Sequence, residues 1–178
     1  MADDRGELSW YSPDPRGIIP LDAFHIPARL KRVLRHQTFR IEVDAAFEEV
    51  IRACAESERD PTDAGTWISE EIIQSYCALH ELGHAHSIEA WEADRLVGGL
   101  YGVALGGAFF GESMFHRVDN ASKVALVALV ERLRGRGFTL LDTQWVTDHL
   151  QQFGATEIPR EEYLRLLEAS LKVDARFN

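Results

Sequence analysis

The stretch HSIEAWEADRLVGGLYGVALGGAFFGESMF, residues 86–115, decides the fold of this chain. Its pattern is that of extended chain, and turn-forming residues interrupt it near residues 93–95 and at Gly106-Gly107. Turns this short join strands that run antiparallel. We therefore expect a meander of three antiparallel strands in the middle of the protein.

Segments with helical periodicity flank this meander. Before it we expect a helix over ARLKRVLR after Pro27, a strand over 38–43, a helix capped by Asp44 to about Glu56, and a helix capped by Ser69 that stops near Gly83. After it we expect an apolar helix opened by Asn120 to about Arg134, a strand over 138–145, a short helix over 147–153 and a last helix over 160–172. A strand that follows a crossover helix becomes a parallel neighbour and leaves a splayed crevice where such sheets bind ligands. The expected class is α+β, or mixed α/β.

Length and composition point to one globular domain. The chain has 178 residues, of which 46% are hydrophobic and 27% charged, so a disordered chain, a collagen-like repeat and a disulfide scaffold are excluded. The formal net charge of −10 argues against a polyanionic partner. The segment 16–40 differs, because it carries six basic side chains and one acidic side chain, a net of +5. A local contact with nucleic acid through this segment is therefore compatible with the negative net charge of the whole chain.

The compartment is expected to be the cytoplasm. The N-terminus has no apolar core of a signal peptide, and no apolar run approaches 18 residues, so no membrane contact is expected. Cys54 and Cys77 are the only cysteines, and both are expected to be reduced thiols. Cys54 falls in a helical stripe with Val50 and Ile51, which favours its burial in the core. We expect residues 1–26 to form an irregular N-terminal segment and residues 27–178 to form the domain.

The string HELGH, residues 80–84, matches the H-E-x-x-H signature of zinc peptidases. That chemistry requires both histidines on one face of a continuous helix, together with a third ligand. Because the chain from Ser87 is extended, His84 and His86 are expected in a turn and a strand. We favour the interpretation that His80 and His84 cover carbonyls at the end of a helix, and we expect no metal.

Polar side chains mark the end of the strand at 138–145. Asp142 and Gln144 are two residues apart and share a face, and their burial without partners would be costly. They either satisfy nearby loop backbone or line the crevice. Glu112, expected in a Gly-Glu-Ser turn after the third strand of the meander, is either a surface carboxylate or a partner for a cationic ligand.

Eight strings occur in a defined order between Trp10 and Leu171. They are WYSPDPRG (10–17), TWIS (66–69), LHELGHAHSIEAW (79–91), LVGGLYGV (96–103), FFGESMF (109–115), NASK (120–123), LLDTQ (140–144) and FGATEIPR (153–160). In these strings the chain resembles the leucyl/phenylalanyl-tRNA–protein transferase family. The resemblance implies a GNAT-like acyltransferase fold, with a central mixed sheet flanked by helices. It also implies transfer of Leu or Phe, with Met as a further candidate, from aminoacyl-tRNA to an N-terminal Arg or Lys of a protein, which marks the product for degradation. No cofactor is implied.

The resemblance assigns roles to particular residues. Asp142 would orient Gln144, Gln144 would position the attacking amine, and Glu112 would hold the cationic acceptor side chain. Trp67 and Tyr76 would bind the terminal adenosine. The aminoacyl side chain would occupy a pocket formed by Leu100, Phe109, Met114, Leu129 and Leu141. The alternative is that these five residues only pack the hydrophobic core. The tRNA would contact the basic helix through Arg29, Lys31, Arg32 and Arg35.

The chain also departs from the family. Other members carry a further N-terminal domain that is largely missing before WYSPDPRG, so we expect a short form that lacks the aromatic partner of Trp67. They have Met and Phe in place of Leu100 and Leu129, which leaves the donor preference open. Three alternatives are an acyl-CoA N-acetyltransferase, the zinc peptidase, and a non-enzymatic binder of N-terminal residues. The acetyltransferase is disfavoured because FHRVDNASK (115–123) lacks a glycine-rich phosphate loop. The oligomeric state is left open.

Overall fold

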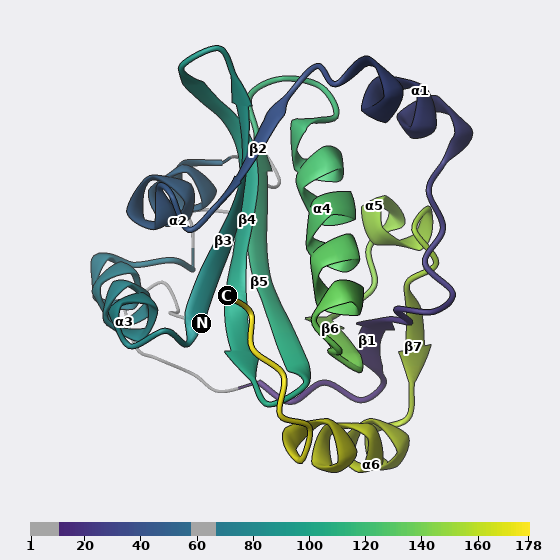
Figure 1. Cartoon of the computed structure of the whole chain (residues 1–178). Helices are drawn as coiled ribbons and strands as arrows, with labels where there is room; N and C mark the ends of the chain where they lie inside the picture. The colour runs from purple at the N-terminus through teal and green to yellow at the C-terminus, as the bar shows by residue number, and fades with distance from the viewer. Residues whose placement is uncertain (1–10, 58–66) are drawn as a thin grey trace.

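A mixed sheet forms the centre of the computed structural model, which describes residues 11–57 and 67–178 (Figure 1). Its strands within these residues are β1 (Arg16–Ile19), β2 (Arg40–Val43), β3 (Ala85–Glu92), β4 (Arg95–Leu105), β5 (Ala108–His116), β6 (Leu140–Gln144) and β7 (Thr156–Ile158). They are arranged in the order β2-β3-β4-β5-β6-β1-β7. The helices are α1 (Ala28–His36), α2 (Phe47–Glu56), α3 (Glu70–Glu81), α4 (Ala121–Gly135), α5 (Asp148–Gln151) and α6 (Arg160–Leu171). The expected mixed α/β class is confirmed.

The predicted meander is β3, β4 and β5. Each pairs antiparallel with the next, and the β4–β5 turn closes at the pair Leu105 and Ala108. Gly106 in that turn has a φ of 56°, and a Cβ atom there would lie 2.8 Å from the carbonyl oxygen of Leu171. Only glycine suits both the left-handed backbone and the close approach of the chain that follows α6.

The crossover helix and the parallel strand also form as expected. After α4, strand β6 pairs parallel to β5 over three residue pairs, from Ala108 and Leu140 to Phe110 and Asp142. Beyond these pairs β5 and β6 are no longer paired, although β5 continues to His116. The sheet is therefore splayed at this point, which is where the crevice was predicted.

The expected irregular N-terminal segment contains strand β1, so that expectation is wrong for residues 16–19. Strand β1 lies between β6 and β7 and pairs antiparallel with both. The segment is rich in Pro and Gly, which are poor strand formers, and its extended form depends on these two neighbours. Strand β7, which has three residues, was also not predicted.

One local prediction is corrected at the start of α2. The helix begins at Phe47 with Ala46 as its N-cap, and Asp44 does not cap it. The carboxylate of Asp44 instead accepts hydrogen bonds from the backbone N–H of Ser87 at 2.9 Å and from His86 Nδ1 at 2.8 Å. Because His86 is buried in β3, its ring requires a hydrogen-bond partner there. The Asp44 carboxylate serves as that partner and does not cap α2. The predicted cap at Ser69 is confirmed, since its side chain accepts from the N–H of Ile72.

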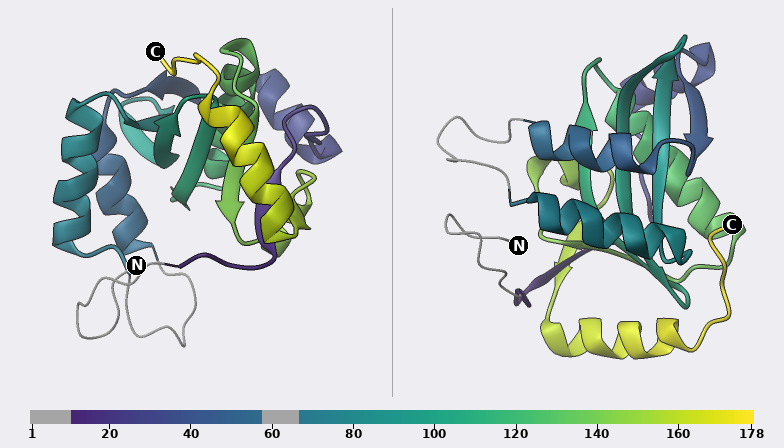
Figure 2. Two further views of the ribbon diagram at one scale, coloured as in Figure 1. Left: turned by 90° about the horizontal axis from the view of Figure 1, so that it is seen from below. Right: turned by 90° about the vertical axis from the view of Figure 1, so that its left-hand side faces the viewer.

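Helices cover both faces of the sheet. Helices α2 and α3 lie side by side on one face, and α4 lies on the other (Figures 1 and 2). The core under α2 and α3 includes Cys54, which is fully buried as predicted. Among the described residues, none of the helices has the length and apolarity that a membrane crossing requires.

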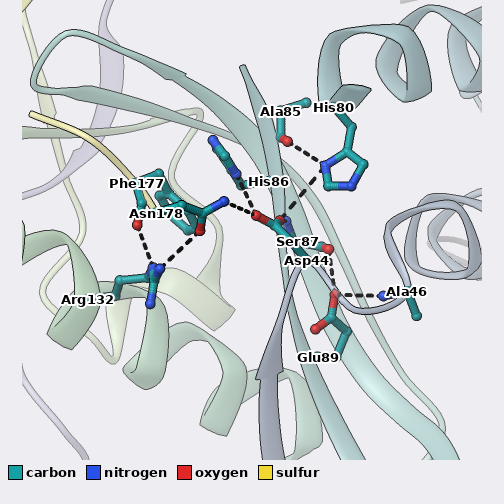
Figure 3. Close-up of polar contacts among 10 residues, drawn as sticks. All are labelled: Asp44, Ala46, His80, Ala85, His86, Ser87, Glu89, Arg132, Phe177 and Asn178. Atoms are coloured by element: carbon teal, nitrogen blue, oxygen red, sulfur yellow. Dashed lines mark hydrogen bonds and ion pairs between the residues drawn. The ribbon is translucent and has the colours of Figure 1, made fainter. Parts of the chain in front are cut away.

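The C-terminal segment returns from α6 and is anchored against the core (Figures 1 and 3). Phe177 is 3% exposed, and its ring centroid lies 4.2 Å from that of His86 and 5.3 Å from that of Phe109. Arg132 of α4 donates to the carbonyl of Phe177 at 2.8 Å, and the amide of Asn178 donates to Asp44 Oδ2 at 2.8 Å. The last two residues therefore join α4, β3 and the loop before α2.

We predict that Phe177→Ala lowers the free energy of unfolding by about 3–5 kcal/mol, because it leaves a cavity where a buried aromatic ring was. Urea unfolding measures this change. The control is Leu164→Ala, at an exposed position of α6, which should shift stability by less than about 0.5 kcal/mol. A decrease below about 1 kcal/mol for Phe177→Ala would show that the C-terminal segment does not contribute to the core.

Candidate active site

A cavity of about 1090 Å³ opens where β5 and β6 separate. Its wall includes most of the site residues expected from the sequence, namely Trp67, Tyr76, Leu100, Glu112, Met114, Leu129, Leu141 and Gln144. Arg16 of β1 also lines it, and this residue was not singled out from the sequence. Asp142 and Phe109 do not line the cavity. Asp142 is buried directly behind Gln144, and Phe109 is buried against Phe177.

Glu112 enters the cavity from a β-bulge, which corrects the expectation of a turn. The β4–β5 register pairs Tyr101 with Ser113 and Gly102 with Gly111, so Glu112 is the extra residue between them. A bulge of this kind redirects a side chain at a functional site without ending the strand. At Gly102 a Cβ atom would lie 2.3 Å from the carbonyl oxygen of Phe110, so a side chain there would push the two strands apart.

Burial raises the pKa of Glu112 to about 7. The hydroxyl of Tyr76 donates a hydrogen bond to the Glu112 carboxylate, and both this bond and the charge of Arg16 act to lower the pKa of Glu112. The negative charge of Asp142 acts to raise it. Burial and the same carboxylate also raise the pKa of Tyr76. Near neutral pH Glu112 is therefore divided between its two forms, and a cation placed beside it would favour the carboxylate.

The carboxylate of Asp142 is wholly buried and bonded to donors on every side. Arg16 binds it in bidentate fashion, with Nε 3.0 Å from Oδ1 and Nη2 2.7 Å from Oδ2. The hydroxyl of Tyr163 in α6 donates to Oδ2 at 2.6 Å, and the backbone N–H of Gln144 donates to Oδ1 at 2.8 Å. The Arg16 guanidinium also lies 4.9 Å from the centre of the Tyr163 ring. Asp142 thus meets the predicted cost of burial through three partners.

These contacts change the ionisation of both side-chain partners. Burial acts to lower the pKa of Arg16, but the hydrogen bonds and negative charge of Asp142 outweigh it and the pKa is raised. The pKa of Tyr163 is raised by burial and by Asp142. Arg16 is therefore a cation and Tyr163 a neutral donor at physiological pH.

Gln144 ends β6 in an unusual backbone conformation. Its φ is 58°, and the N–H of Trp145 donates to the carbonyl of Thr143 at 2.7 Å, so Gln144 is the central residue of a γ-turn. A non-glycine residue at positive φ in such a turn carries strain, which surrounding contacts must offset. Gly17 of β1 packs beneath it, because a Cβ atom at Gly17 would lie 2.6 Å from the carbonyl carbon of Trp145.

The HELGH string lacks the continuous helix that the zinc-peptidase signature requires. Helix α3 ends at Glu81, and His84 lies beyond it. The expected capping role of the histidine side chains is also corrected, because backbone groups cap the helix. The N–H of Gly83, at φ 77°, donates to His80 O and the N–H of His84 donates to Leu79 O.

His80 instead belongs to a polar cluster with Asp44 and His86 (Figure 3). Their ligand-type atoms lie within 4.8 Å of one another, which is close enough to suggest a cation. His80 Nδ1 lies 2.8 Å from the carbonyl oxygen of Ala85, and His86 Nδ1 lies 2.8 Å from Asp44 Oδ2, so both Nδ1 atoms are engaged in hydrogen bonds. The cluster is a hydrogen-bonded connection between α3, β3 and the α2 loop.

The four basic residues expected to meet tRNA lie on α1, away from the cavity lining. Arg29, Lys31, Arg32 and Arg35 are all exposed, and within the described residues none of them forms an ion pair. Helix α1 packs against α4. This arrangement leaves the four charges open to solvent on one short helix.

Comparison with known proteins identifies relatives of high similarity. The chain is 58% identical to the leucyl/phenylalanyl-tRNA–protein transferase of Phenylobacterium zucineum, over 99% of this chain and 80% of that protein. It is 57% identical to the enzyme of the same name from Herpetosiphon aurantiacus, over 98% and 89%. The Salinibacter ruber protein of that name is 55% identical, over 96% and 73%.

Solved structures resemble the chain more remotely. A domain assigned to a lysylphosphatidylglycerol synthetase of Agrobacterium fabrum matches with a TM-score of 0.49 at 11% identity, over 88% of this chain and 52% of that one. An aminoglycoside acetyltransferase from a soil metagenome, in complex with sisomicin, matches with a TM-score of 0.45 at 12% identity, over 79% and 91%. The family model described as leucyl/phenylalanyl-tRNA protein transferase matches residues 18–168, and the chain belongs to this family of enzymes.

Proposed function

We propose that this protein transfers Leu or Phe, with Met as a further candidate, from aminoacyl-tRNA to an N-terminal Arg or Lys of a protein in the cytoplasm. The product would carry a bulky apolar N-terminal residue, which serves as a degradation signal. The observation that carries the proposal is the cavity at the splay of β5 and β6, which has an apolar wall and the half-buried carboxylate of Glu112 side by side. These two features suit the two substrates, one apolar and one cationic.

The donor would bind across the splay. Trp67 and Tyr76 offer aromatic surfaces on which an unpaired adenine can stack. The aminoacyl side chain would enter the apolar wall formed by Leu100, Met114, Leu129 and Leu141. Phe109 would support that wall from behind, since it is buried and does not line the cavity.

The acceptor would place its Arg or Lys side chain beside Glu112. Bringing a cation to this half-protonated carboxyl would complete its ionisation and form a charge-assisted hydrogen bond. The α-amino group would then lie near the amide of Gln144, whose backbone is held by Asp142. A neutral N-terminal side chain would leave Glu112 without a counter-ion in the cavity.

The reaction is the aminolysis of an ester. The neutral α-amine of the acceptor attacks the carbonyl carbon, the new C–N bond forms, and the C–O bond to the ribose breaks. The proton lost by the amine ends on the ribose oxygen, so the products are a peptide bond and free tRNA. A free α-amine has a pKa near 7.7–8.0, so a useful fraction is neutral at physiological pH. Positioning by Gln144 would lower the entropic part of the barrier.

Transfer to a peptide tests this function. We expect Leu-tRNA and Phe-tRNA to extend a peptide beginning with Arg or Lys by one residue, as measured by mass spectrometry. A matched peptide beginning with Ala should be unchanged, as should the Arg peptide incubated with acetyl-CoA, the donor of the alternative enzyme class. Absence of product with all charged tRNAs would rule out the proposed function.

Glu112→Gln should remove the preference for a cation. We predict that the wild type favours an acceptor beginning with Arg over one beginning with citrulline, its uncharged analogue, by about 10–100-fold in kcat/KM. The variant should show a ratio near one, mainly through a rise in KM for the Arg peptide. The citrulline peptide serves as the internal control for folding. A preference that survives the substitution would assign recognition of the cation to another group.

The basic face of α1 should contribute to tRNA affinity. We predict that Lys31→Gln with Arg35→Gln weakens tRNA binding and makes it less dependent on salt, by about one unit of slope for each phosphate that is no longer neutralised. Arg165→Gln, an exposed charge change on α6, is the matched control and should alter neither quantity. Titration by fluorescence anisotropy between about 50 and 200 mM salt measures the slope. An unchanged slope would exclude α1 from the tRNA interface.

A further inference from the structure

We propose that Tyr163 of α6 is a positioning residue for this reaction. Together with Arg16 it holds the carboxylate of Asp142. Asp142 in turn holds the γ-turn that presents Gln144 to the cavity. The inference rests on the proposed function for the reaction itself, and on the geometry for the positioning.

The position of Tyr163 excludes a direct contact with substrate. Its side chain is 6% exposed, is packed with Ile18, Ala108 and Leu140, and does not line the cavity. Its hydroxyl donates to Asp142 Oδ2 at 2.6 Å and also interacts with Arg16, the side chain that binds the same carboxylate. Any effect of the hydroxyl on the reaction must therefore pass through the pair formed by Asp142 and Arg16.

The donors around Asp142 divide between its two oxygens. Oδ2 accepts from Tyr163 and from Arg16 Nη2, whereas Oδ1 accepts from Arg16 Nε and from the N–H of Gln144. Removal of the Tyr163 hydroxyl leaves Arg16 as the only side chain that orients the carboxylate. The carboxylate can then tilt toward Arg16, and the bond from Oδ1 to the Gln144 N–H is weakened.

The turn at Gln144 is the element that needs this support. Its φ of 58° is sparsely populated for glutamine, so the conformation persists only while its neighbours hold it. The supports are the Asp142 carboxylate, reached by the Gln144 N–H, and β1, whose Gly17 packs against Trp145. Because Arg16 and Gly17 are adjacent in β1, one strand contributes to both.

Tyr163→Phe tests the proposal by removing one hydroxyl. We expect kcat to fall about tenfold, the usual effect of removing a hydrogen bond to a charged group, with KM for donor and acceptor unchanged. The matched control is Ser170→Ala on the same helix, which removes the 2.8 Å bond between Ser170 and Thr139 without touching Asp142. The control should lose stability but keep kcat. Equal decreases of kcat in both variants, or a change confined to KM, would overturn the proposal.

Two further measurements decide between positioning and general stability. In an Asp142→Asn background, Tyr163→Phe should lower kcat by less than about twofold, because its route of action has already been removed. Additive decreases would contradict this. Amide hydrogen exchange at Gln144 should become about tenfold faster in Tyr163→Phe and stay unchanged in Ser170→Ala. The exchange measurement requires no substrate, so it decides the positioning role even if the wild type transfers no amino acid.

Discussion

The ion pair between Arg16 and Asp142 is the interaction on which the active site depends. Asp142 is fully buried at the point where β5 and β6 part, and an unpaired carboxylate there would destabilise the fold. Arg16 supplies both the charge and the fork geometry that such a carboxylate requires. The pair joins residues 126 positions apart, so strands β1 and β6 must be assembled together.

The splay of the sheet follows from the same region. Parallel pairing of β5 with β6 stops after Phe110 and Asp142, and the bulge at Glu112 begins on the unpaired side. One strand therefore changes course where the other ends in a γ-turn, and the space between them becomes the cavity. Glu112 and Gln144 lie on opposite sides of this opening because each belongs to a local departure from regular strand geometry.

The parts of the fold that were predictable are those whose pattern is local. The meander, α4 and the splayed crossover follow from periodicity and turn residues, and each is confirmed. Strand β1 was missed because Arg16–Ile19 is extended only through its pairing with β6 and β7. The Glu112 bulge was missed for a similar reason, since a register shift between two strands leaves no mark on one of them alone. The family-specific sequence strings predicted that Glu112, Gln144 and the residues of the apolar wall belong to the site. Tyr163 was not predicted, because it lies in a helix whose pattern indicates only packing.

Two carboxylates in one site are given different tasks by their surroundings. Asp142 has its counter-ion built into the chain, so its charge is balanced before any substrate arrives and its lone pairs are used to hold structure. Burial raises the pKa of Glu112 to about 7, while Arg16, committed to Asp142, acts on it only at longer range. A carboxyl that lacks its own counter-ion gains most from a cation that the substrate brings. The same arginine thus fixes one carboxylate as a support and leaves the other without a counter-ion of its own, which is the state that the proposed acceptor, beginning with Arg or Lys, would require.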